Sequence, residues 1–225
     1  MILEHPVQSG DKSGQSEPKM KTLQRVILCL PIFAVLAIAV VSSVNYARSS
    51  QRVAALQSGE RDVAEHAQYL RATDAVDYPT EWIATASQLA AQDPSRNDDA
   101  IALLEAALDA NPDHPNAWAQ LAYLYTIRAG GFDDAAARAL QNSIDLCPYC
   151  GREILRWRFT FVLQHWDAVP ESLRADVFSG ADFLRWWYLD YTYLNSVRGD
   201  ALERGIPFDA YRRNVNTPIR PSEVQ

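Results

Sequence analysis

A stretch that repeats itself thirty-six residues later constrains the fold of this chain more than any other feature. Residues 98–112 (DDAIALLEAALDANP) align with residues 134–148 (DAAARALQNSIDLCP). In each copy, small residues let two helices approach closely, a larger one fills the groove between them, and a proline ends the second helix. This self-similarity predicts an all-α solenoid, in which residues 79–148 form two helix pairs. The matched positions are Ala100, Leu104, Ala107 and Pro112, and then Ala136, Leu140, Ser143 and Pro148.

The residues between the two copies also follow a known pattern. The residue types of a tetratricopeptide first helix occur at that family's spacing, at Trp118, Leu121, Ala122 and Tyr125. The chain therefore resembles the tetratricopeptide repeat family over about residues 80–148. The unit from Trp118 to Pro148 is about two residues longer than the usual repeat, and Asn142 or Ser143 stands where alanine is customary. The resemblance implies a concave surface, built from the first helices, that binds partner proteins.

The remainder of the chain must extend this solenoid, because about three repeats are needed for a continuous core. Residues 149–213 are predicted to form a degenerate repeat and an aromatic-rich cap, with helices at about 152–166, 171–179, 182–198 and 207–213. On the helix 182–198 the aromatic residues fall on two faces, which implies two neighbours. One is the repeat core, and the other is either a later segment or a partner protein. The candidate partner surface consists of Trp186, Trp187, Tyr191 and Tyr193.

An apolar segment near the N-terminus has a different character. Residues 26–44 (VILCLPIFAVLAIAVVSSV) are nineteen residues without a charge, which at about 1.5 Å per residue spans a hydrocarbon core of about 30 Å. We expect a transmembrane helix at 26–46, with a cleaved signal peptide as the alternative. Four basic residues precede it and two follow it closely, which favours a disordered cytoplasmic tail at 1–25 and an exported domain. This topology predicts a bacterial inner-membrane protein with a periplasmic domain.

Residues 47–78 are predicted to form a helical stalk between this segment and the repeats. A narrow apolar stripe runs along it, with Gly59 and Glu60 inside: Val53, Leu56, Val63, Ala67 and Leu70. Either the stripe pairs with a second copy, which makes 48–72 a self-association segment, or it packs as a spacer or against its own domain. Residues 214–225 are expected to be a flexible tail.

The string Cys147-Pro148-Tyr149-Cys150 raises the question of thiol chemistry. Similar strings occur in thiol–disulfide exchange proteins of the glutaredoxin type, where the first thiol lies at a helix N-terminus in a fold that contains strands. Nothing in this sequence alternates as a strand does. Three interpretations stay open: a local disulfide or two passive thiols, a redox pair, or a metal site that needs further ligands.

The net charge and the absence of known catalytic motifs exclude several classes of function. The chain has 21 Lys and Arg against 28 Asp and Glu and a net charge of −7, so it has no electrostatic reason to bind nucleic acid. It lacks a phosphate-binding loop, a nucleophile elbow and a zinc-protease helix, so we expect no catalytic residue, metal or cofactor. The predicted function is a membrane-anchored scaffold or assembly factor for an envelope protein. The alternatives are an accessory subunit of a larger membrane complex and an envelope thiol–disulfide protein that uses Cys147 and Cys150.

Overall fold

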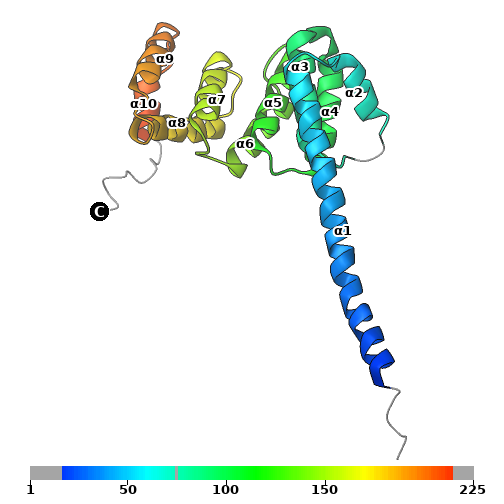
Figure 1. Ribbon diagram of the computed structural model, residues 1–225. Helices are drawn as coiled ribbons and strands as arrows, with labels where there is room; N and C mark the ends of the chain where they lie inside the picture. Colours follow the sequence, from blue (N-terminus) through cyan, green and yellow to red (C-terminus); the bar gives the residue numbers. More distant parts are fainter. Residues whose placement is uncertain (1–16, 74–75, 215–225) are drawn as a thin grey trace, which may run out of the picture. The chain divides into compact units, whose positions relative to one another are not determined.

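The computed structural model describes residues 17–73 and 76–214, and it describes side chains at 32, 34–73 and 76–212. Within these ranges the regular elements are ten α-helices and one short 3-10 helix, without a strand (Figure 1). The predicted all-α class is therefore confirmed. The chain divides after Ser49 into two units, and we describe each by itself.

The first unit contains most of helix α1 (Glu17–Gln57). The helix begins inside the predicted disordered tail at 1–25, because Met, Lys, Leu and Gln after Glu17 are good helix formers. Among the residues described, no helix combines the length and the apolar character needed to cross a membrane. The side chains of 26–31 and 33, which belong to the predicted span, lie outside the described residues. Several large apolar side chains that follow are exposed: Ile32, Val35, Leu36, Ile38, Val40, Val41 and Val44.

The last turns of α1 belong to the second unit and do not form a stalk. The helix ends at Gln57, Gly59 adopts a left-handed φ of 76°, and Asp62 starts α2 (Val63–Arg71) by accepting a hydrogen bond from the Glu65 amide at 2.9 Å. The predicted stripe is buried in the core of its own domain at Leu56, Val63, Ala67 and Leu70. The structure thus shows the second of the two interpretations, and no continuous stripe is left at 48–72 for pairing with a copy.

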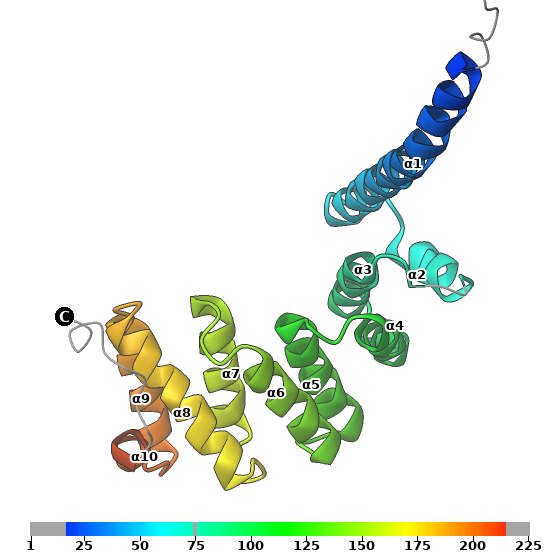
Figure 2. The ribbon, with the colours of Figure 1, turned by 90° about the horizontal axis from the view of Figure 1, so that it is seen from below.

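Two helix pairs follow, as Figure 2 shows from below. Prolines at the first position start α3 (Pro79–Gln92) and α5 (Pro115–Ala129), where a missing N–H costs nothing. Their partners α4 (Asn97–Ala110) and α6 (Asp134–Leu146) end two residues before Pro112 and Pro148. A short 3-10 helix, η1 (Pro94–Arg96), joins α3 to α4. The repeat residues predicted to pack the core are at most 2% exposed: Ala100, Leu104, Ala107, Leu121, Ala122, Ala136 and Leu140.

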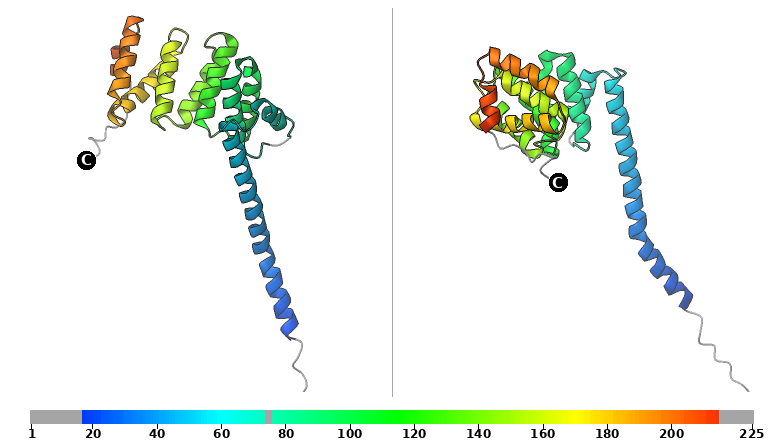
Figure 3. Two further views of the ribbon diagram at one scale, coloured as in Figure 1. Left: turned by 45° about the horizontal axis from the view of Figure 1, so that its top comes forward. Right: turned by 90° about the vertical axis from the view of Figure 1, so that its left-hand side faces the viewer.

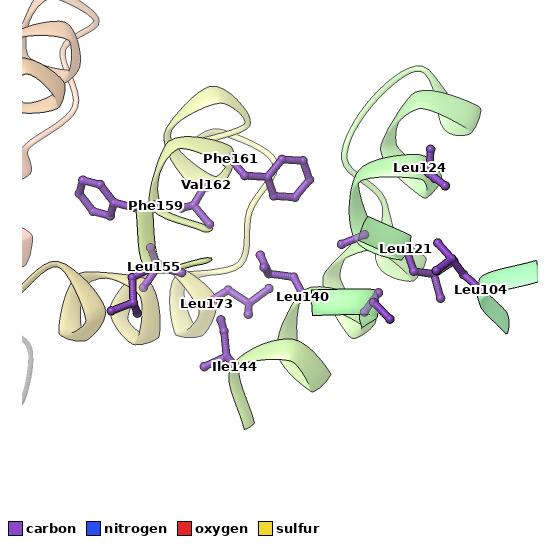
Figure 4. Close-up of a cluster of buried hydrophobic side chains, with 14 of the residues drawn as sticks. Leu104, Leu121, Leu124, Leu140, Ile144, Leu155, Phe159, Phe161, Val162 and Leu173 are labelled. Atoms are coloured by element: carbon purple, nitrogen blue, oxygen red, sulfur yellow. The ribbon is translucent and has the colours of Figure 1, made fainter. Parts of the chain in front are cut away.

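The core continues without interruption into the next pair, α7 (Arg152–Gln164) and α8 (Glu171–Trp186). Figure 4 shows Leu104, Leu121 and Leu140 followed along the same core by Leu155 and Leu173. The pair therefore acts as the third repeat that a solenoid needs.

The predicted boundaries fail within this C-terminal part (Figure 3). The expected break near residue 180 is absent, because Gly180 faces inward and a Cβ there would lie 3.0 Å from Leu155. The predicted helix 182–198 is instead broken between α8 and α9 (Tyr191–Glu203), where Leu189 has a left-handed φ of 53°. The argument that one helix presents two aromatic faces is therefore wrong. The last helix, α10 (Phe208–Asn214), closes the aromatic core, and residues of the predicted tail after Asn214 lie outside the described part.

Candidate protein-interaction groove

A groove of about 1040 Å³ lies between α5 and α7, which are the first helices of successive pairs. The resemblance implies partner binding on the face made by the first helices, and the groove is lined by α5 and α7 but by no residue of α3. One wall comes from α5 and the other from α7 and the turn before it. The lining residues used below are Asn116, Ala119, Gln120 and Tyr123 on α5, and Arg152, Arg156, Trp157 and Thr160 on α7.

The α5 wall is mixed in polarity. Asn116 and Gln120 lie one helical turn apart, and Ser87 Oγ of α3 donates a hydrogen bond of 2.6 Å to Gln120 Oε1. That bond holds the Gln120 carboxamide at the groove wall. Tyr123 is half exposed a further turn along, while Ala119 is buried and leaves the floor open. The wall therefore offers two amide groups beside an aromatic ring.

The α7 wall is fixed by contacts with the start of α9. Arg156 donates two hydrogen bonds to the Asp190 carboxylate, at 2.6 and 2.7 Å, and this guanidinium lowers the pKa of Asp190. The Tyr193 hydroxyl donates to the Arg156 carbonyl at 2.8 Å and lies 2.8 Å from the Thr160 hydroxyl, and burial raises the pKa of Tyr193 to about 12. Trp157 stacks on Phe161 with ring centroids 4.8 Å apart. These contacts hold the wall in one conformation.

A buried arginine fixes the turn at one end of the groove. Arg158 is 2% exposed and donates to the Cys147 carbonyl at 2.8 Å, to Ser143 Oγ at 2.9 Å and to the Ser143 carbonyl. Ser143 Oγ in turn donates to the Pro115 carbonyl at 2.7 Å. Ser143, the departure from the family's alanine, therefore joins α5, α6 and α7. Burial lowers the pKa of Arg158, but its ordinary value is far above neutrality, so the guanidinium stays charged.

Sequence reasoning missed Arg158, although a signal was present. The residue lies three positions after Leu155 and four before Val162, on the helix face that is otherwise apolar. A charged residue on a core face is a candidate for capping buried carbonyl groups, because an arginine with all its donors engaged is tolerated there.

The two cysteines of the turn, Cys147 and Cys150, lie at the end of α6 and in the turn before α7. Both are free thiols, and Cys150 Sγ donates to the Cys147 carbonyl at 3.5 Å. Partial burial of the thiol and its hydrogen bond with Cys147 raise the pKa of Cys150 to about 11, whereas a redox thiol needs a lowered pKa. No cluster of three or more metal-binding side chains occurs in the part of the chain that the structure describes. Free thiols and a raised pKa of Cys150 are the features expected of two passive thiols, and the role of the pair stays a prediction.

The predicted partner surface is only partly exposed. Trp187 and Tyr191 are open to solvent, but Trp186 is half-buried under the Arg185 guanidinium, which lies 5.0 Å from its ring centroid. Tyr193 turns inward, as described above. The helix break explains the difference, because it rotates the residues after Trp187 away from the register of α8.

The two aromatic repeat positions, Trp118 and Tyr125, are half-buried and hydrogen-bonded, whereas Pro112 and Pro148 are exposed. Trp118 Nε1 donates to the Pro112 carbonyl at 2.9 Å, which ties α5 to the end of α4. The Tyr125 hydroxyl donates to Glu105 Oε1 at 2.7 Å, and burial together with this bond raises the pKa of Tyr125 to about 12. Both residues therefore connect neighbouring helix pairs.

Comparison with known families gives the same repeat class. Residues 79–124 match the tetratricopeptide repeat. The match covers α3, α4 and most of α5, one helix pair earlier than the unit from Trp118 to Pro148 on which the resemblance was strongest. The comparisons with curated proteins and with solved structures find no match. Tetratricopeptide repeats are typically protein-interaction modules without catalysis, so this stretch supports a protein-binding function.

Proposed function

We propose that this protein is an interaction scaffold whose α5–α7 groove binds an extended segment of a partner protein. The observation that carries the proposal is the pair of carboxamides on α5. One helical turn separates Asn116 from Gln120 by about 6 Å along the axis, and two residues of an extended chain span about 6.6 Å. Both amides can therefore pair with successive backbone groups on one edge of the same segment.

The aromatic side chains of the groove supply the second part of the recognition. Tyr123 and Trp157 come from the two walls, and the small Ala119 lies on the α5 wall. An apolar side chain of the partner fits between these rings. Tyr and Trp are the residue types that contribute most to binding when they are buried in an interface.

Photo-crosslinking in living cells tests this function on the full chain. A photoreactive phenylalanine analogue at Tyr123 is expected to crosslink a recurrent protein, and the crosslink is expected to disappear when Trp157→Ala or Asn116→Ala is added. The matched control is the same analogue at Leu202, an exposed apolar position on α9 outside the groove. Crosslinks that are equal at both positions, or insensitive to the groove variants, contradict the proposal.

We further propose that residues 26–46 anchor the scaffold in a bacterial inner membrane, with the N-terminus in the cytoplasm and the domain in the periplasm. The uncharged stretch at 26–44 and the exposed apolar side chains between Ile32 and Val44 support the anchor. Such a tether raises the effective concentration of the domain near envelope partners, which suits an assembly factor.

Alkaline extraction of membranes and protease protection test the anchor separately from the groove. The full chain is expected to resist extraction, and its C-terminal domain is expected to be cleaved only when the protease enters the periplasm. Release of the protein by alkali contradicts the anchor. Loss of an N-terminal tag from the mature protein would favour the cleaved signal peptide.

A further inference from the structure

The connection between α8 and α9 exposes three large apolar side chains within five residues. Trp187 is 58% exposed, Leu189 is 62% exposed and Tyr191 is 44% exposed. We call residues 187–191 the apolar loop. Apolar side chains that are exposed next to one another commonly mark binding sites, whereas single exposed ones are ordinary.

The apolar loop is held in this exposed arrangement. Leu189 has a left-handed φ of 53°, which is unfavourable for a residue with a Cβ. The Asp190 amide donates to the Leu184 carbonyl at 3.0 Å, and the Asp190 carboxylate is buried against Arg156. Strained backbone conformations that are maintained by surrounding contacts are common at functional sites. The loop therefore presents its side chains in a fixed geometry before any partner arrives.

The apolar loop is continuous with the α7 wall of the groove. Arg156 lines the groove and holds Asp190, while Arg152 lines the groove and places its guanidinium 5.4 Å from the Tyr188 ring centroid. On the other side, Phe183 stacks on Trp187 with centroids 5.6 Å apart and on Tyr149 at 4.8 Å. A segment that leaves the groove at the start of α7 thus meets the loop next.

Arg152 makes no ion pair among the described residues, although its charge also contributes to the lowered pKa of Asp190, whose carboxylate is bound by Arg156. Arg156 pairs with Asp190 and lies 3.5 Å from Glu153, and Arg158 is buried on carbonyl groups. None of the ion pairs found among the described residues includes Arg152, which is exposed. The Tyr188 ring lies against the face of the Arg152 guanidinium, so the N–H groups at its edge stay available to a ligand. Carboxylates are the groups that match this edge best.

We propose that the partner segment bound in the groove carries an acidic side chain beside a large apolar one, with the carboxylate on Arg152 and the apolar side chain on the apolar loop. This inference rests on the proposed function of the groove. It commits to a protein partner rather than a lipid surface, because the loop continues a groove whose paired amides suit a polypeptide backbone.

Selection of random twelve-residue peptides displayed on phage, with the full chain as target, tests this inference. Enriched peptides are expected to share Asp or Glu next to Leu, Phe or Trp. Synthetic copies are expected to bind about tenfold more weakly to Arg152→Gln, since a charge-assisted hydrogen bond is lost, and to weaken similarly with Leu189→Ser. Arg128→Gln is the matched control, because Arg128 also stacks on a ring, 4.8 Å from the Tyr125 centroid, but does not line the groove.

The outcomes separate the two proposals. Peptides that need Trp157 but show no acidic residue and bind Arg152→Gln normally overturn the further inference and leave the groove intact. Recovery of no peptide whose binding depends on Trp157 or Asn116 overturns the proposed function as well. Labelling of the apolar loop by a photoactivatable phospholipid in vesicles that contain the full chain, without peptide binding at Arg152, would assign the loop to a membrane surface instead.

Discussion

The two halves of the repeat domain fill their cores with different side chains. From α3 to α6, alanines at close-approach positions and leucines between them fill the core, as at Ala107 and Leu140. From α7 to α10, rings such as Phe159 and Phe178 fill it, with centroids 5.1 Å apart, and a buried arginine satisfies the carbonyls where the halves meet. The groove lies at this junction, between α5 and α7. The regular half, α3 to α6, therefore sets the spacing of the helices, and the aromatic half, α7 to α10, supplies the α7 wall of the groove.

The largest expected effect tests the aromatic half directly. Phe178→Ala removes a fully buried ring that contacts Phe159 and Phe208 and should lower the free energy of unfolding by about 4 kcal/mol. Leu104→Ala, the equivalent change in the regular half, should cost about 3 kcal/mol. Urea denaturation of both variants measures the difference. A smaller loss for Phe178→Ala than for Leu104→Ala would mean that the rings pack loosely.

The junction itself is tested at Arg158. Arg158→Met keeps much of the volume but leaves carbonyl groups of Ser143 and Cys147 without a donor, so we expect a loss of about 3 kcal/mol in the free energy of unfolding. The control, Arg156→Met on the same helix, should cost much less because that side chain is partly exposed. Neutral or higher stability for Arg158→Met would show that the desolvation cost of the guanidinium exceeds the value of its hydrogen bonds.

Asp190→Asn, which removes the acidic partner of the ion pair at the α7 wall, should have a smaller effect: about 1 kcal/mol in the free energy of unfolding. Hydrogen bonds and the charge of Arg156 lower the folded-state pKa of Asp190, so its contribution is fully present above the ordinary carboxyl pKa of about 3.9 and is lost as the pH falls through the folded value. Asp190→Asn should therefore be less stable at pH 7 and should lose less further stability on acidification below about pH 4. Parallel acid-induced loss in both proteins would contradict this role.

The smallest expected effect concerns the cysteines at the junction. Cys147→Ser and Cys150→Ser should each change the free energy of unfolding by less than about 0.5 kcal/mol, because neither thiol packs the core. In the Cys147→Ser background the contribution of Cys147 is removed but burial still raises the pKa of Cys150, so its alkylation by iodoacetamide should be slower at pH 7 than that of a fully exposed thiol. Fast alkylation at neutral pH would reopen the redox interpretation.

Local sequence patterns predicted the regular half well. The prolines predicted to close the second helices, Pro112 and Pro148, lie two residues after the ends of α4 and α6, and the alanine and leucine spacing marks the buried faces. The aromatic half lacked such markers. A helix end was predicted near residue 180, and only the close approach of Gly180 to Leu155 shows that the helix continues there with the glycine packed inward. The sequence showed that the stripe from Leu56 to Leu70 is apolar, but it did not show that the stripe packs into the core of its own domain.

The sequence by itself determined the all-α class and the repeat period, because these depend on residues three to four positions apart on one helix. The tertiary structure decided the rest. Two contacts join residues that are far apart in the chain: Ser143 with Arg158, and Arg156 with Asp190. The exposure of Leu189 depends on the residues packed around its loop. No local sequence pattern encodes either kind of information. Side chains meet across a solenoid according to how its pairs stack, so the groove and its unpaired Arg152 appear only once that stacking is known.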